Sequence, residues 1–304
     1  MPLTYTATGI NLKSSPLGES DRLLTILTKE HGLIRAVAPG ARKQKSTLSG
    51  RSGIFAINHL LLHKGRSLDT ITQAETVESY PGLSKNLGKL ASAQYLAEIA
   101  LSFGISEHPQ EELFSLLCEH LSRIEELSGF HIHSRLLAML SHGVYHLLAL
   151  DGIAPQVHSC CVSQQSLIPD FENPSFLTGF SIIAGGCLNL KEIEQLNSIS
   201  QKPQQTNPSQ NLGIERTYAP EKPLRIDTKL DPYQLALLQQ LTQPDLNGIP
   251  QTLTAAEAAD IQKSWVAVER ILRHYAEYHL ERSIRSAALI DTYFSSLPSS
   301  PVQL

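Results

Sequence analysis

Short runs of alternating apolar and polar residues, separated by tight turns, predict five β-strands in the first 80 residues. Two of the turns, Lys29–Gly32 and Gly65–Ser67, contain a glycine that supplies the positive φ of a hairpin. Five short strands are too few for a β-sandwich and enough for a small barrel. The predicted strands are Thr4–Lys13, Asp21–Thr28, Leu33–Ala38, Ile54–Lys64 and Leu68–Glu78.

After Pro81-Gly82 the apolar period becomes helical. Three helices joined by short loops predict a bundle, and we expect two later helices to pack back onto it because each has one apolar face. The fold class is therefore α+β, with a barrel domain over residues 1–80 and an all-α domain over residues 81–304. The predicted helices are Leu83–Leu101, Pro109–Ser128, Ile132–Leu150, Asp231–Gln240 and Ala255–Leu280.

Two segments of the second domain break the helical pattern. Residues 153–190 contain scattered prolines, the pair Gly185-Gly186 and short apolar runs, which predict a small irregular module. Asn197–Asn211 is a polar, low-complexity tract that has no means of burying a core, so we predict that residues 197–211 are disordered.

Charge is unevenly distributed along the chain. Residues 1–80 carry 10 Lys and Arg against 6 Asp and Glu, a net of +4, whereas the other 224 residues carry 15 against 23, a net of −8. No acidic residue occurs between Glu30 and Asp69. A field of one sign attracts polyanions whatever the total charge is. The alternative is a solvated loop whose acidic neighbours come from elsewhere in the fold.

The segment Gly40–Gly53 holds most of this positive charge and connects the third and fourth predicted strands. A five-stranded barrel with a basic loop at this place is the pattern of an oligonucleotide-binding fold. The loop has no large apolar anchor in its sequence, so we expect it to be mobile without a ligand.

Three of the four cysteines are candidate ligands of a structural zinc ion. Cys160, Cys161 and Cys187 lie in the irregular module with His158 nearby, but a structural zinc site needs two ligand pairs, and no ligand follows Cys187. We therefore expect no zinc there and no cofactor. Cys118 falls in a helical pattern, where a buried free thiol is expected.

Motifs of catalysis are missing from the sequence. It contains no G-x-S-x-G elbow, no Walker loop and no H-E-x-x-H, and its 12 histidines cluster most closely at His120 and at His131–His133. We expect no catalytic site and no enzyme activity.

A late helical segment is basic, but acidic residues are interleaved with its cations. We favour i,i+4 ion pairs on an exposed face over a nucleic-acid surface. The cations are Arg270, Arg273, His274, Arg282 and Arg285, and the acids are Glu269, Glu277 and Glu281.

Composition sets the class of protein. The 304 residues are 41% hydrophobic with a net charge of −4, as expected for a folded chain. No apolar stretch is long enough to span a membrane, residues 1–5 do not begin a secretory signal, and four cysteines do not make a disulfide scaffold. We expect a reducing, cytoplasmic location and no membrane partner.

A series of ordered motifs resembles the RecO family of bacterial DNA repair proteins over most of the chain, most weakly at residues 190–225. The motifs are Thr8–Ile10, Leu17–Arg22, Glu30–Leu33, Ala38–Lys43, Leu48–Arg51, Thr72–Glu75, Tyr95–Glu98, Arg135–Leu137 and Arg273–Leu280.

The resemblance implies an N-terminal oligonucleotide-binding fold, a helical domain and a zinc-finger-like insertion. It also implies binding of single- and double-stranded DNA, annealing of complementary strands and, with these, association with the nucleoid. The family acts with RecR and RecF to load RecA onto DNA coated by single-stranded DNA-binding protein (SSB). The family takes the acidic, apolar C-terminal tail of SSB into a groove of the helical domain. The family's four-cysteine pattern is not intact here, and members without zinc exist, so we predict that the insertion has lost its metal.

The candidate binding residues follow from these inferences. Tyr5 and Phe55 are the aromatic candidates for base stacking, although both are also core candidates. Arg123 and Arg135 are candidates for the SSB tail or, equally, for surface ion pairs. Two alternatives remain: a barrel that binds RNA in translation or transcription, and an enzyme that uses Cys160 or Cys161 with His158. The predicted DNA-binding residues are Arg35, Arg42, Lys43, Lys45, Arg51, Lys64 and Arg66.

Overall fold

The structure is a computed structural model that describes residues 3–129, 132–173, 175–191, 193, 225–246 and 255–295. The chain forms two compact units, Met1–Ile153 with Leu246–Leu304, and Ala154–Asp245. Each unit is described by itself. The tract predicted to be disordered, residues 197–211, lies outside the described residues.

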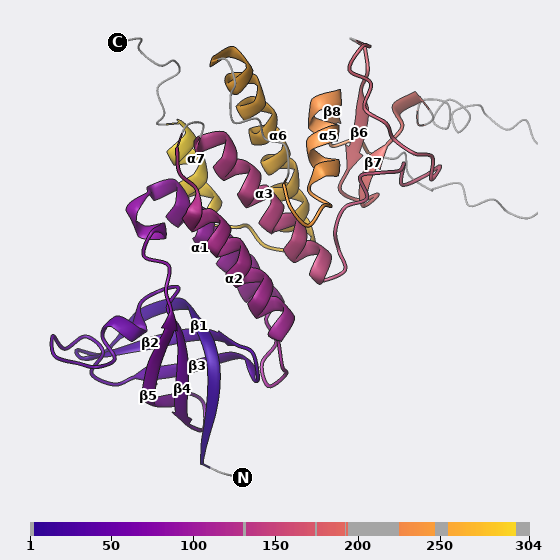
Figure 1. The fold of residues 1–304 in the computed structure, drawn as a ribbon. Coiled ribbons are helices and arrows are strands. Elements are labelled where there is room, and N and C mark those ends of the chain that lie inside the picture. The colour runs from indigo at the N-terminus through magenta and orange to yellow at the C-terminus, as the bar shows by residue number, and fades with distance from the viewer. Residues whose placement is uncertain are drawn as a thin grey trace, which may run out of the picture. The chain divides into compact units, whose positions relative to one another are not determined.

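The first unit begins with a closed five-stranded barrel (Figure 1). Its strand order is β1-β2-β3-β5-β4, in which β3 and β5 are parallel and the other pairs are antiparallel. The predicted barrel is therefore confirmed, with the strand order of an oligonucleotide-binding fold. The strands are β1 (Thr4–Leu17), β2 (Asp21–Thr28), β3 (Gly32–Ala38), β4 (Ile57–His63) and β5 (Asp69–Glu78).

Alternation of side chains gives the barrel its core. Successive residues of a strand point to opposite faces, so every second residue faces the inside of the barrel, and these inward residues are mainly apolar. Leu24 and Ile26 of β2, and Leu60 and Leu62 of β4, are among the inward residues. On β4 the outward neighbours His59, Leu61 and His63 are exposed or half-buried, which leaves the outer face of this strand available for contacts.

The predicted helical domain follows the barrel. Its central helix, α1, is buried over most of its length, as expected for a helix that is apolar on several faces. Asn86 caps it by accepting a hydrogen bond from the Lys89 backbone N–H, so it starts four residues later than predicted. Pro109 precedes the second helix instead of lying in its first turn. The helices are α1 (Leu87–Phe103), α2 (Glu111–Glu126), α3 (Ile132–Leu150), α6 (Ala255–His279) and α7 (Ala287–Ser295).

The late helices differ from the prediction in two ways. Helix α6 packs against α3 as expected, and α7, which was not predicted, packs against α1 (Figure 1). The helix α5 (Pro232–Gln240) does not join this bundle, because it belongs to the second unit. None of the helices in the described ranges has both the length and the apolar composition needed to cross a membrane.

The prediction that the ion pairs of the basic segment lie on an exposed face is wrong for its central pair. Arg273 forms the predicted i,i+4 ion pair with Glu269, but the Glu269 side chain is buried and that of Arg273 is only 11% exposed, and Arg273 also binds Asp291 of α7. Burial raises the pKa of Glu269, while hydrogen bonds from Arg273 oppose this rise. Arg273 therefore holds α6 to α7 and is not part of an exposed basic surface.

The second unit contains a small sheet and one helix. Its strands are β6 (Thr178–Ser181), β7 (Gly186–Leu188) and β8 (Thr228–Leu230), in the order β7-β6-β8. The Gln239 side chain of α5 donates hydrogen bonds to the carbonyls of Val157 and Leu167. The unit is larger than the predicted insertion of residues 153–190, because β8 and α5 complete it.

Within the first unit, the β2–β3 turn is joined to the segment before α2. The N–H of Leu33 donates to the Ile105 carbonyl, and the N–H of Glu107 donates to the His31 carbonyl, both at 3.0 Å. Gly32 lies between them with a φ of 64°. A Cβ at Gly32 would overlap the Ile105 carbonyl and lie 2.6 Å from the carbonyl oxygen of His108.

We predict that Gly32→Ala lowers the free energy of unfolding more than Gly18→Ala does. Both glycines have positive φ, but a Cβ at Gly18 meets nothing within 4 Å. Gly18→Ala should cost about 1–2 kcal/mol for the left-handed backbone alone. Gly32→Ala should cost about 1–3 kcal/mol more, because the overlap is with backbone atoms. Urea unfolding monitored by circular dichroism measures both, and equal losses would contradict the described junction.

Candidate functional site

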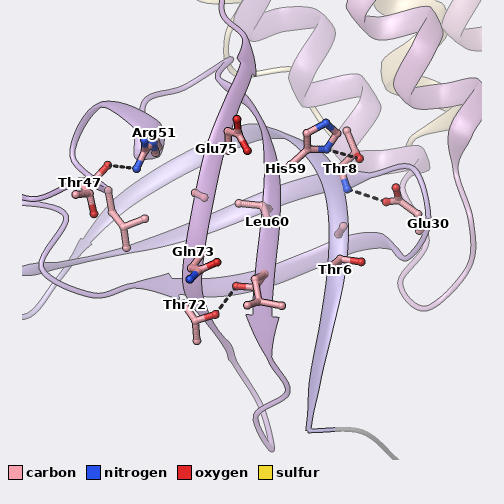
Figure 2. Close-up of a pocket in the computed structure, with 14 residues that line it drawn as sticks. Thr6, Thr8, Glu30, Thr47, Arg51, His59, Leu60, Thr72, Gln73 and Glu75 are labelled. Carbon is pink, nitrogen blue, oxygen red and sulfur yellow. Dashed lines mark hydrogen bonds between the residues drawn. The ribbon is translucent and has the colours of Figure 1, made fainter.

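A groove crosses the outer face of the barrel over β1, β4 and β5 (Figure 2). It has a volume of about 740 Å³. Outward-facing residues of these strands line it, since Thr6 and Thr8 alternate with the inward residue Ala7 on β1. On the β3–β4 loop it reaches Thr47 and Arg51.

The groove is polar and mixed in charge. The Thr8 hydroxyl lies 3.0 Å from His59 Nδ1, and the Thr8 N–H donates to the Glu30 carboxylate at 2.9 Å. Figure 2 shows Glu30 beside β1, with Arg51 and Glu75 on the other side of β4. Only Arg51 among the seven predicted DNA-binding residues lines the groove. A chain of phosphates cannot be held by this groove alone, because its carboxylates oppose its cations.

The basic loop, residues 40–53, brings four of the predicted residues together. Arg42, Lys43 and Lys45 are exposed, and Arg51 is half-buried at the edge of the groove. The Arg42 guanidinium donates to the Gly18 carbonyl at 2.7 Å, which leaves its other donors available. The described residues give Lys45 no ion-pair partner.

Asp21 holds the start of the basic loop. Its carboxylate accepts hydrogen bonds from the Gly40 N–H at 2.8 Å and from the Ser20 hydroxyl at 2.7 Å. These bonds lower the pKa of Asp21, and the nearby Lys43 contributes. The first residues of the loop are thus tied to the β1–β2 turn.

The expectation that the basic loop lacks an apolar anchor is wrong. Leu48 is only 9% exposed and packs in the barrel core, as does Ala41. The Arg51 carbonyl accepts hydrogen bonds from the side-chain amides of Asn11 and Asn58, at 2.8 and 3.0 Å. Leu48 stands alone among polar residues in the sequence, where no periodicity indicates which way it points.

The other three predicted DNA-binding residues lie elsewhere on the barrel. Arg35 is exposed on β3, opposite Thr25. Lys64 and Arg66 lie in the β4–β5 turn, at the end of β4 away from the basic loop. Seven residues of strand separate these ends by about 20 Å. Lys64 lies 3.6 Å from the Glu107 carboxylate and over the Tyr5 ring.

The two aromatic candidates do not form a stacking platform. Phe55 is 3% exposed and belongs to the core. Tyr5 is half-buried, meets His31 edge to face and donates a hydrogen bond to Asp69. Burial, together with Asp69, raises the pKa of Tyr5.

The candidates for a partner tail lie on the helices. Arg123 of α2 pairs with Glu119 and donates to His142 Nδ1 at 3.3 Å. Arg135 of α3 donates to the Ser128 carbonyl at 3.0 Å. Both side chains are half-buried.

A second groove in the same unit joins basic and apolar residues. It has a volume of about 1010 Å³ and is lined by residues of β1, α1 and the segment leading into α7. Lys13, Arg282 and Arg285 supply its positive charge, which Glu98 partly opposes, and Ile54 and Leu289 supply exposed apolar surface. Sequence analysis did not predict it, since its residues come from segments far apart in the chain.

The cysteine module does not have the geometry of a nucleophilic site. His158 Nε2 lies 3.1 Å from the Thr242 hydroxyl, and no described hydrogen bond joins its ring to Cys160 or Cys161. Burial raises the pKa of the Cys187 thiol and, less strongly, that of Cys161. Burial also acts on Cys160, but hydrogen bonds from Ser163 and Asn189 lower its pKa. A general base for a thiol is missing from this described arrangement.

The structure reveals one cluster that sequence analysis missed. His120 of α2 meets His142 and His146 of α3. The i,i+4 spacing of His142 and His146 was the available signal, whereas the third member comes from another helix.

Comparisons with known proteins match both parts of the chain. Residues 1–80 match the family described as Recombination protein O N terminal, and residues 84–192 match Recombination protein O C terminal. The DNA repair protein RecO of Nostoc sp. is 51% identical over 303 residues, covering 97% of this chain and 98% of that protein. Those of Trichodesmium erythraeum and Acaryochloris marina are 52% and 48% identical, covering 98% of this chain and 97% and 98% of the relatives.

We predict that Leu48→Ala loosens the basic loop. Removing a buried leucine side chain should lower the free energy of unfolding by about 2 kcal/mol or more. Trypsin should then cleave after Arg42, Lys43 or Lys45 several times faster than in the wild type. Thr47→Ala, which changes the exposed neighbour, is the matched control. A cleavage rate unchanged by Leu48→Ala would contradict the anchoring role of Leu48.

Proposed function

The chain belongs to the RecO family of DNA repair proteins, and from this premise we propose that it is a recombination mediator. It binds single- and double-stranded DNA on the basic loop of its barrel and anneals complementary strands. The barrel domain, residues 1–80, is the DNA-binding domain in this proposal. The supporting observation is the group of exposed cations, Arg42, Lys43 and Lys45, on a loop anchored by Leu48 beside the groove.

Phosphate contacts explain binding without base readout. Each Lys or Arg placed at a phosphate releases a condensed counterion, so affinity falls as salt rises. The basic loop has the chemistry for this, because no acidic residue interrupts the segment between Glu30 and Asp69. Single strands continue from the loop into the polar groove, where hydroxyl and amide side chains line the path.

Annealing follows from neutralising two backbones at once. The basic loop and the pair Lys64 and Arg66 lie at opposite ends of β4. Two groups of cations about 20 Å apart can each hold one strand. Arg35 extends the positive surface on β3. Charge neutralisation of this kind requires no ATP and no catalytic residue.

The partners in this proposal are those that the family implies. RecR, with RecF as a further partner, joins the protein on DNA, and RecA is then loaded on SSB-coated strands. The SSB tail is acidic and apolar, so its site needs an Arg beside an apolar surface. Arg123 and Arg135 are the proposed residues, and the second groove, with Arg282 and Arg285, is the competing location.

We predict that the triple variant Arg42→Ala/Lys43→Ala/Lys45→Ala binds a labelled single strand with a smaller salt dependence. The slope of log K against log salt should fall by about two units, at ~0.7 per lost phosphate contact. Fluorescence anisotropy titrations at several KCl concentrations measure this slope.

The matched control removes three exposed lysines outside the barrel, as Lys85→Ala/Lys229→Ala/Lys263→Ala. It has the same change in net charge, so it should leave the slope unchanged. If both triple variants behave alike, the basic loop is not the DNA surface. An unlabelled RNA strand that displaces the DNA far better than a DNA competitor would favour an RNA-binding protein of translation or transcription.

We predict that Arg123→Ala/Arg135→Ala weakens binding of a labelled SSB-tail peptide by at least tenfold, or ~1.4 kcal/mol. DNA binding by the barrel should be unaffected, because neither residue lies on it. Arg282→Ala/Arg285→Ala is the matched control. Loss of peptide binding only in this control would move the tail to the second groove.

A further inference from the structure

The three histidines between α2 and α3 form a cluster that the proposed function does not use. His142 and His146 lie one turn apart on α3, and His120 reaches them from α2. Each offers one ring nitrogen, and these nitrogens lie within 4.8 Å of one another. Across the described part of the chain, this is the only such group of three His, Cys, Asp or Glu side chains.

The spacing of the cluster fits a tetrahedral metal ion. Ligand atoms on zinc, with bonds of about 2.0–2.1 Å, lie about 3.3–3.4 Å apart. His120 Nε2 and His146 Nδ1 are 3.3 Å apart. The rings of His142 and His146 have centroids 3.9 Å apart, and each lies about 5 Å from that of His120. The three ligand nitrogens lie within 4.8 Å of one another, so the widest pair must close by at most about 1.4 Å for all three to reach one ion.

The ring of His120 is buried with one nitrogen unpaired in the part of the chain that the structure describes. His120 and His142 are almost fully buried, and His146 is half-buried. The Nδ1 atom of His120 has no hydrogen-bond partner among the described residues. Burial, with the neighbouring His142 and His146, lowers the pKa of His120 to about 2.

Close helix packing brings the third ligand within reach. Gly143 follows His142 on α3, and a Cβ at this position would lie 2.9 Å from the Leu96 side chain and 3.3 Å from Cγ of His120. The missing side chain thus lets the ring of His120 approach α3.

From this arrangement we propose that His120, His142 and His146 bind one transition-metal ion of the Zn²⁺ class. Imidazole nitrogen suits zinc and the neighbouring late first-row metals. Three protein ligands leave the fourth tetrahedral position to a water molecule. The ion would hold α2 against α3 within the helical domain.

Arg123 competes with the ion. Its guanidinium is always protonated and donates to His142 Nδ1, so it occupies a lone pair and places a positive charge beside the site. Metal binding therefore releases Arg123 from His142. Glu119, which already accepts from Arg123, retains it on α2. Arg123→Gln should consequently tighten metal binding.

The test uses the full chain, stripped with a chelator and titrated with Zn²⁺ and with Co²⁺. We expect one ion per chain, and visible Co²⁺ absorption of tetrahedral type without the near-ultraviolet band of thiolate ligands. His146→Gln should weaken Zn²⁺ binding at least 100-fold, more than the ~10–100-fold loss typical of an outer-shell partner. Saturating Zn²⁺ should raise the melting temperature of the wild type and not that of His146→Gln.

His274→Ala, which removes an exposed histidine of α6, is the matched control and should bind Zn²⁺ like the wild type. A wild-type chain that binds no ion, or a His146→Gln chain that binds as tightly as the wild type, overturns the proposal. If His146→Gln fails to fold, the Co²⁺ spectrum of the wild type decides. A thiolate band there would place the ion at the cysteines and overturn the histidine site.

Discussion

The double pairing of β1 is the constraint on which the barrel and its basic loop depend. β1 pairs with β4 over Thr4–Ile10 and with β2 from Gly9 to Leu17, so one strand closes the barrel and leaves no open edge there. The register of β1 with β2 shifts between Asn11 and Lys13, where the strand bends. At this bend the Asn11 side chain binds the carbonyls of Arg51 and Gly53. The closure of the barrel therefore also fixes the end of the basic loop.

Because of this constraint, the groove and the exposed cations occupy different parts of the barrel surface. The groove forms where β1, β4 and β5 present their outward residues, and it contains Glu30 and Glu75 as well as Arg51. The exposed cations Arg42, Lys43 and Lys45 lie beside it, on the loop that β1 and the buried Leu48 hold in place. A polyanion would thus be attracted by the loop and guided by the groove, which is a division of roles suited to binding without sequence preference.

In the helical domain the same problem, polar groups removed from water, is solved in two ways. The largely buried Arg273 pairs with two carboxylates, the buried Glu269 on its own helix and the exposed Asp291 on α7, so its charge is compensated. Of the three histidines, His120 and His142 are buried, and the Nδ1 atom of His120 has no hydrogen-bond partner among the described residues. Among the described residues, the two polar clusters thus differ in composition: one joins opposite charges, and the other gathers three imidazoles around a spacing that suits one ion.

Local sequence determined the positions of the five barrel strands and of helices α1, α2, α3, α5 and α6, because the alternation of strands and the 3.6-residue repeat of helices are properties of short segments. It did not indicate α7 or the short strands β6, β7 and β8. Thus the ends of β2, α3 and α5 lie within one residue of the predicted ends, and the sequence alone indicated the basic segment between Glu30 and Asp69. Tertiary structure alone decided that Leu48 points inward, that α5 joins the second unit, and that Arg273 is buried. It also decided that His120 meets two histidines 22 and 26 residues away. Periodicity identifies the apolar face of each element, whereas the partner of that face depends on long-range packing that no short segment encodes.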